Sequence, residues 1–357
     1  VAIILARTGR MADGESDRDA RLDLGGTALS ALGLGLVVFG ILRAGAWGFV
    51  NPKPGAPVWI GLSPTIWLML GGGLVLLVFA AWEKRRVEAG QSVLIDPTIL
   101  RNPVLRGGLT AFLFQFLLQA GLFFCVPLYL SVALGLSAVE TGIRILPLSI
   151  TLLLAAVGVP KIWPQASPQR VARFGFLGLL AGIVSLMGAL GRGAGPEIVT
   201  LPLLLAGLGI GALASQLGAV TVSSVPDEQS PEVGGLQNTF TNLGASVGTA
   251  LAGAILVSAL TTSFFTGIQD NPAIPETLTS KAQVEFAGGI QFIPDSDLEA
   301  ALSKAGITGD TAQAIMEENS QSRIAGLRAA LAALAVLAIA ATACSSLCMR
   351  CPTSDSP

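Results

Sequence analysis

The polar residues with the most chemical promise lie inside a long uncharged run. Gln115 and Gln119 are four residues apart, so they share one face if the run is helical. Phe112, Phe116 and Phe123 fall near that face. Amides set among aromatic rings suit a large, partly apolar organic ligand, because the amides orient it and the rings provide contact area. The alternative is that the amides hydrogen-bond to a neighbouring helix and only hold the bundle together.

A second polar group opens a later run. Asn238 and Asn242 again share a helix face, and they either line a cavity or bond within the bundle. Gln216, in the preceding run, is a weaker candidate of the same kind. Gly244 and Gly248 form a small-xxx-small pair, which predicts close packing against another helix.

Residues for enzyme or metal chemistry are scarce. The sequence has no histidine, and its four cysteines do not have the spacing of a zinc site. Gly207, Gly209 and Gly211 form a GxGxG pattern without the preceding strand that a dinucleotide site requires. Helix packing is the better explanation for these glycines. We therefore expect no catalytic residues, no metal site and no cofactor.

The composition indicates a membrane protein. The chain is 52% hydrophobic and only 12% charged, whereas soluble domains carry roughly 25% charged residues. A water-soluble protein could not hide so much apolar surface, so a lipid bilayer is the expected solvent. The net charge of −2 gives no basic field for a nucleic acid.

The uncharged runs have the length of membrane-spanning helices. They are apolar on all sides and about 20 residues long, whereas barrel strands are half that length and alternate polar with apolar residues. The expected fold is an all-α, polytopic membrane helix bundle. The eight predicted spans are residues 23–44, 63–82, 108–133, 143–160, 172–190, 199–220, 235–261 and 325–348.

Basic residues predict the orientation. With both ends of the chain in the cytoplasm, 13 of the 21 basic residues fall on the inner side, as membrane proteins favour. Residues 262–322, with nine acidic residues and two lysines, then lie outside. Ser296 with Glu299, and Asp310 with Gln313, resemble capping boxes that open two helices. This loop is expected to form a helical cap, either a solvated spacer or a gate.

Proline and acidic residues bear on transport. Pro127, Pro147 and Pro202 are predicted to interrupt and bend three spans, as helices that rock between two openings need. Acidic residues are not expected deep in any span, so a carboxylate that carries protons must come from elsewhere. Residues 1–6 read as the tail of an apolar helix, which predicts that the chain is truncated at its amino end.

Four stretches resemble one family. They are DLGGTALSALGLGLVVFGILRAGAWGF from Asp23, PLYLSVALGLSAVETGIRILP from Pro127, the longer stretch Pro202–Ala254, and SRIAGLRAALAALA from Ser322 after the acidic loop. In order and type they are similar to the carboxy-terminal part of fourteen-span drug:proton antiporters of the major facilitator superfamily, EmrB/QacA type. The Pro202–Ala254 stretch is the most specific.

The resemblance implies a domain organisation. Members have a six-helix bundle, two additional helices and a second six-helix bundle. The expected parts are the end of a preceding helix with a linker at 1–22, the additional helix pair at 23–82, a cytoplasmic linker at 83–106, the second bundle at 107–261 and 323–348, the external acidic loop at 262–322, and a cytoplasmic tail at 349–357.

The resemblance also implies a function. Members export hydrophobic drugs and dyes from the cell across the plasma membrane, in exchange for protons, by alternating access. One alternative is an exporter of a natural product made by the same cell, such as a siderophore or antibiotic. Another is a membrane scaffold or sensor without transport, although the sequence shows no large soluble domain to support it.

Overall fold

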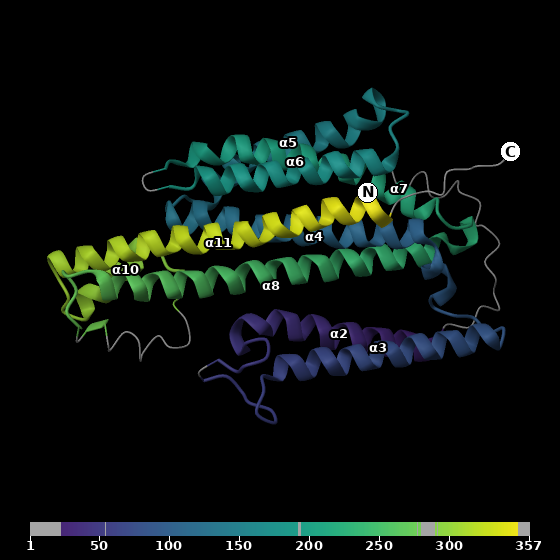
Figure 1. The fold of residues 1–357 in the computed structure, drawn as a ribbon, viewed down its shortest axis with the longest axis horizontal. Coiled ribbons are helices and arrows are strands. Elements are labelled where there is room, and N and C mark those ends of the chain that lie inside the picture. The colour runs from purple at the N-terminus through teal and green to yellow at the C-terminus, as the bar shows by residue number, and fades with distance from the viewer. Residues whose placement is uncertain are drawn as a thin grey trace.

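The computed structural model describes a bundle of long helices (Figure 1). The described residues are 23–53, 55–191, 194–276, 278–279, 290 and 292–348. The predicted helix end at residues 1–6 and the tail at 349–357 lie outside them. The α-helices are α2 (Leu24–Trp47), α3 (Pro64–Glu88), α4 (Pro103–Leu128), α5 (Ala138–Ile162), α6 (Pro168–Ala189), α7 (Thr200–Val222), α8 (Ser230–Asp270), α10 (Asp295–Lys304) and α11 (Asp310–Cys348).

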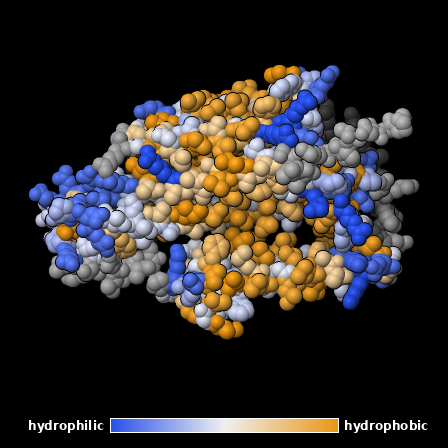
Figure 2. All heavy atoms as spheres, in the orientation of Figure 1, coloured by the Kyte–Doolittle hydropathy of each residue, from blue (hydrophilic) through white to orange (hydrophobic). Residues whose placement is uncertain are grey.

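Eight helices in the described part of the chain are long and apolar enough to cross a membrane, which confirms the all-α polytopic prediction. Figure 2 shows hydrophobic residues over the middle of the helices and hydrophilic residues toward both ends. Large apolar side chains remain exposed there, such as Leu77 of α3 at 69% and Leu153 of α5 at 63%. A continuous exposed apolar surface of this kind requires lipid rather than water around it.

The bundle is built around α4 and α7. α4 packs against α8 and α11, while α7 packs between α5 and α6. Gly207 and Gly211 face the carbonyl groups of α5, and Gly209 faces the backbone of α6, at positions where a β-carbon would overlap the neighbouring helix. The predicted packing role of the GxGxG pattern is therefore correct. Gly244 and Gly248 of α8 lie in the same way against the backbone of α4.

α2 and α3 form a separate antiparallel pair along one edge of the bundle (Figure 1). Gly33 of α2 and Gly72 of α3 meet where the two backbones approach most closely. α2 also contacts α8, so the pair rests against the remaining helices through α8. The connection to α4 includes a short 3₁₀ helix, Pro97–Arg101.

Several helices continue beyond the predicted spans. α8 runs to Asp270, and α11 begins at Asp310 and continues into the last span, as predicted, although Asp310 is its first residue rather than its N-cap. The short helix predicted near Ser296 is present as α10, but its capping box is wrong, because α10 begins at Asp295 with Pro294 at its N-cap. Hydropathy alone reports only the part of a helix that crosses lipid, so these polar extensions escaped it.

The prolines lie in different environments. Pro127 lies inside α4, just before a π-helical turn at Tyr129–Ala133, and Pro147 lies inside α5. Pro202 is the third residue of α7. The first turn of a helix has no acceptors for its N–H groups, so a proline there costs no hydrogen bond. The predicted interruption at Pro202 is therefore wrong.

Candidate functional site

The two glutamines of α4 have unsatisfied oxygens. Gln115 is 3% exposed, and the Oε1 atoms of Gln115 and Gln119 are both buried without a hydrogen-bond partner among the described residues. A buried polar atom without a partner costs about 1–3 kcal/mol. Two such atoms on one helix face are therefore unusual, and each keeps an unused hydrogen-bond acceptor.

Two of the three predicted phenylalanines form a pair beside them. The rings of Phe112 and Phe116 are stacked, with centroids 6.3 Å apart and planes 11° apart. Both side chains are only partly buried. Phe123 is about two turns further along α4 and 41% exposed, so it is not part of this pair. The stacked pair offers a flat apolar surface next to the amide oxygens.

Gln216 of α7 lies at a similar depth. Gly108 near the start of α4 faces Thr221 near the end of α7, so the two helices run antiparallel. Gln216 comes five residues before Thr221, which places it about 7.5 Å further along the axis, level with the region of Gln115. Its side chain is half-buried.

Gln237 is a site residue that the sequence reasoning did not select. Its side-chain amide donates to the Thr221 hydroxyl and to the Gly218 carbonyl oxygen at 3.3 Å, and so joins α8 to α7. One feature of the sequence could have identified Gln237. It comes four residues after Val233, so it lies on the side of α8 where Val233 and Leu236 are buried. Thr221, which accepts this hydrogen bond, also faces Gly108 near the start of α4. The bridge therefore lies near that end of the α4 face that carries the glutamines.

The two asparagines of α8 are not brought together with the glutamines. Asn238 and Asn242 are exposed on the surface of the described chain. They are hydrogen-bonded to each other. The Asn242 side-chain amide donates to Oδ1 of Asn238 at 3.1 Å and to the backbone oxygen of Asn238 at 2.9 Å. The predicted polar site residues thus divide into the two glutamines of α4, half-buried Gln216 of α7 at a similar depth, and an exposed pair on α8.

An acidic side chain is buried where none was expected. The predicted second span ended at residue 82, but α3 continues to Glu88 and buries Glu83 completely. Glu83 lies close to Asp23 at the start of α2. Glu83 directly precedes Lys84, Arg85 and Arg86, so it is buried at the charged end of α3 rather than deep in the span.

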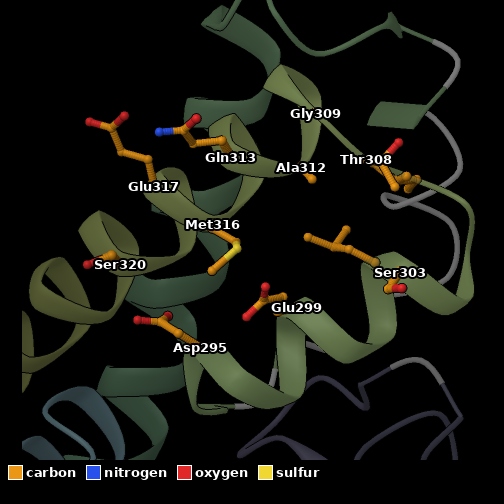
Figure 3. Close-up of a pocket in the computed structure, with 12 residues that line it drawn as sticks. Asp295, Glu299, Ser303, Thr308, Gly309, Ala312, Gln313, Met316, Glu317 and Ser320 are labelled. Carbon is orange, nitrogen blue, oxygen red and sulfur yellow. The ribbon is translucent and has the colours of Figure 1, made fainter.

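A cavity of about 620 Å³ lies between α10 and the first turns of α11, far along the chain from the α4 glutamines. Figure 3 shows Asp295 and Glu299 of α10 and Met316 of α11 around this space. Beneath it, buried Arg323 pairs with Asp295 and donates to the Ile293 carbonyl oxygen at 3.0 Å. This ion pair fixes the start of α10 to α11.

Comparison with known proteins places these features in a family. The family profile described as Major Facilitator Superfamily matches residues 20–249. The chain is 25% identical over 291 residues to a probable actinorhodin transporter of Streptomyces coelicolor, a match that covers 80% of this chain and 47% of that protein.

Two other relatives match a similar share of the chain at similar identity. A tetracenomycin C resistance and export protein of Streptomyces glaucescens is 29% identical over 266 residues, covering 72% of this chain and 45% of the relative. A puromycin resistance protein of Streptomyces alboniger is 29% identical over 257 residues, covering 69% and 46%. The chain thus spans about half the length of these curated relatives. With eight helices able to span a membrane and a family match over more than half of its length, the chain belongs to the Major Facilitator Superfamily.

Proposed function

We propose that this chain forms part of a secondary transporter that exports hydrophobic organic compounds from the cell in exchange for protons. The superfamily membership and the export and resistance proteins among its relatives support the class. The two unpartnered glutamine oxygens beside the stacked phenylalanines support the location of the substrate site.

The chemistry of this face selects a kind of substrate. Carbonyl oxygens accept hydrogen bonds, so the ligand must supply O–H or N–H donors. A stacked pair of rings favours a flat or aromatic body. The substrate we infer is therefore a planar, mostly apolar compound with donor groups along one edge.

We propose the domain arrangement of a fourteen-span antiporter. α2 and α3 are then the additional pair, and α4–α8 with α11 form the second six-helix bundle. The substrate binds between this bundle and a first one, near the middle of the membrane, where alternating access requires it. Both ends of the chain lie in the cytoplasm of a plasma-membrane protein, and the α10 region lies outside.

The test uses Gln115→Leu and Gln119→Leu in the complete transporter, with efflux of a fluorescent dye and thermal stability measured together. Leucine removes an unsatisfied oxygen, so stability should stay equal or rise, while efflux should fall by at least about tenfold, as the loss of roughly 1.4 kcal/mol of binding predicts. A structural role predicts the reverse, with lower stability and efflux that follows the amount of folded protein.

Thr110→Val is the matched control. Thr110 lies on the same helix, but its hydroxyl donates to the Arg106 carbonyl oxygen at 2.8 Å within α4. We expect this variant to keep normal efflux. Normal efflux in both glutamine variants, at normal expression, would remove these residues from the substrate site.

A second candidate is export of an aromatic natural product made by the same cell. The similarity to a probable actinorhodin transporter and to a tetracenomycin C export protein favours it. Competition separates the two candidates: a natural product made by the same cell should block dye efflux at lower concentration than an unrelated cationic dye if the natural product is the main substrate. No efflux of either compound in vesicles would instead favour the non-transporting scaffold.

A further inference from the structure

Two carboxyl groups and one guanidinium meet where α2 begins and α3 ends. Asp23 caps α2 by accepting a hydrogen bond from the Gly26 N–H at 2.9 Å. Its Oδ2 atom also accepts from the Trp82 indole at 3.1 Å and pairs with Nε of Arg86 at 3.2 Å. Asp23 is therefore a well-satisfied carboxylate, although it is only 7% exposed.

Glu83 lies beside it with half of its carboxyl group unsatisfied. The side chain is 0% exposed. Oε2 accepts the Leu94 N–H at 3.0 Å, whereas Oε1 has no partner among the described residues. Oε1 of Glu83 and Oδ2 of Asp23 both border the point where a β-carbon on Gly26 would lie. The two carboxyl groups thus face each other across a space that only glycine leaves open.

Among the described residues, the charges around Glu83 do not balance. In that part of the chain, the charged groups that act on it are Asp23 from α2 and Arg86 from its own helix, and the linker contributes the N–H groups of Leu94 and Ile95. The Arg86 guanidinium is already engaged by Asp23 and by the Ser92 carbonyl oxygen at 2.8 Å. Two ionised carboxylates in this buried contact would leave one negative charge uncompensated.

The environment decides which carboxyl group stays ionised. Burial by itself raises the pKa of Asp23, but the Gly26 N–H, the Trp82 indole and the Arg86 charge outweigh it and hold this pKa below its ordinary value of 3.8. Glu83 has one backbone donor and a negative neighbour. A protonated Oε1 of Glu83 would donate to Asp23 and satisfy the orphan atom.

We propose that Asp23 and Glu83 form a proton-binding site that holds one proton on Glu83, directed at the Asp23 carboxylate. The proton enters from water and returns to water, with no other bond made or broken. When it leaves, the two like charges push the start of α2 away from Glu83, which also holds the Leu94 N–H of the linker. The linker beyond this point is tied to α8, because the Asp96 N–H donates to Glu232 at 2.9 Å. Loss of the proton therefore changes how the helix pair is held on the second bundle.

Infrared spectroscopy of the purified full chain in lipid nanodiscs tests the site without any transport assay. The wild type should show, at neutral pH, a protonated-carboxyl C=O band that shifts in heavy water. Glu83→Gln should lose this band. The matched control is Glu88→Gln on the same helix, an exposed residue whose carboxylate lies 3.9 Å from Lys84, and it should keep the band. A wild type without the band, or a Glu83→Gln variant that retains it, overturns the proposal.

Two further variants keep the test decisive. Glutamine is the neutral isostere of protonated glutamate, so Glu83→Gln should fold with unchanged thermal stability, and failure to fold counts against the proposal. Asp23→Asn should also abolish the band, because Glu83 then has Arg86 as its own counter-charge. If the wild type lacks the band and is stabilised by sodium ions at constant ionic strength, the site holds a metal cation and the proposal is wrong.

Discussion

Gly248 of α8 has no room for a side chain, because a β-carbon there would overlap the Leu117 carbonyl group of α4. Gly244 contacts the backbone at Leu113 one turn earlier. These two contacts set how closely α8 approaches the helix that carries the glutamines. Glycine is required at these positions by helix packing rather than by backbone conformation.

Substituting Gly248→Ala should therefore lower the stability of the bundle. Inserting a methyl group into a closed helix contact costs about 1–3 kcal/mol, which thermal unfolding in detergent will detect. Gly235→Ala is the control, since Gly235 lies on the same helix with open space around it. The control should be neutral or up to about 1 kcal/mol more stable, because alanine favours helix. Equal effects of the two substitutions would contradict this packing role.

Individual residues were predictable only where one helix determines the outcome. The shared face of Gln115 and Gln119 follows from a spacing of four residues. The burial of Glu83 does not, because it depends on the pairing of α2 with α3, and hydropathy marks a glutamate as the end of a span. Phe123 and Asn238 satisfied the same local pattern, yet the structure leaves both exposed.

The position of α10 depends on one buried side chain of α11. Arg323 is 2% exposed, and it pairs with Asp295 and binds two backbone oxygens. Arg323→Met keeps the bulk of the side chain but removes these bonds, so we expect the attachment of α10 to weaken by about 2–3 kcal/mol. Amide hydrogen exchange should then speed up in residues 295–304. Lys304→Met, at the exposed end of α10, should leave exchange unchanged. Slow exchange in both variants would show that other contacts hold α10.

The start of α2 should respond to acid. Because the pKa of Asp23 is below 3.8 in the folded protein, its carboxylate contributes stability that is complete above the unfolded pKa and is lost as the pH falls through the folded value. With Glu83 replaced by Gln in both proteins, so that only Asp23 titrates at this contact, the stability difference between Glu83→Gln and the double variant Glu83→Gln/Asp23→Asn should be constant near neutral pH and shrink in strong acid. Asp297→Asn, at an exposed position of α10, should give no such trend. A difference that grows on acidification would contradict the assignment.

Helix existence was predictable from the sequence, but helix length was not. Each uncharged run became a helix because backbone groups in lipid must be satisfied within the segment. The polar extensions of α8 and α11 have no hydrophobic signature in the sequence. They are held by contacts with each other, such as Gly267 of α8 against the Glu318 side chain of α11, which only the folded structure reveals.

At the scale of the whole molecule, the proposed orientation places the linker after α3 and the α10 region on opposite sides of the membrane. Gln91 and Ser303 are exposed representatives of the two regions. In a background without native cysteines, Ser303→Cys should react with a membrane-impermeant maleimide in intact cells. Gln91→Cys should react only after the cells are permeabilised. Labelling of both in intact cells would contradict an odd number of spans between them.

The fold class followed from composition, because so little charge in so long a chain is stable only in lipid. The arrangement of the helices did not follow, since glycines occur in every span and only the residues that they contact distinguish them. The packing of α7 between α5 and α6 is a property of the assembled bundle.

α8 contains 41 residues and α11 contains 39. A helix of that length measures about 60 Å, twice the roughly 30 Å of hydrocarbon in a bilayer. Each is thus a continuous rod that carries the α10 region well clear of the lipid. A tilt of the rods inside the membrane must move that region by a larger distance than it moves the buried turns. An antibody fragment against α10 could therefore restrain or report the conformation of the membrane core without entering the bilayer.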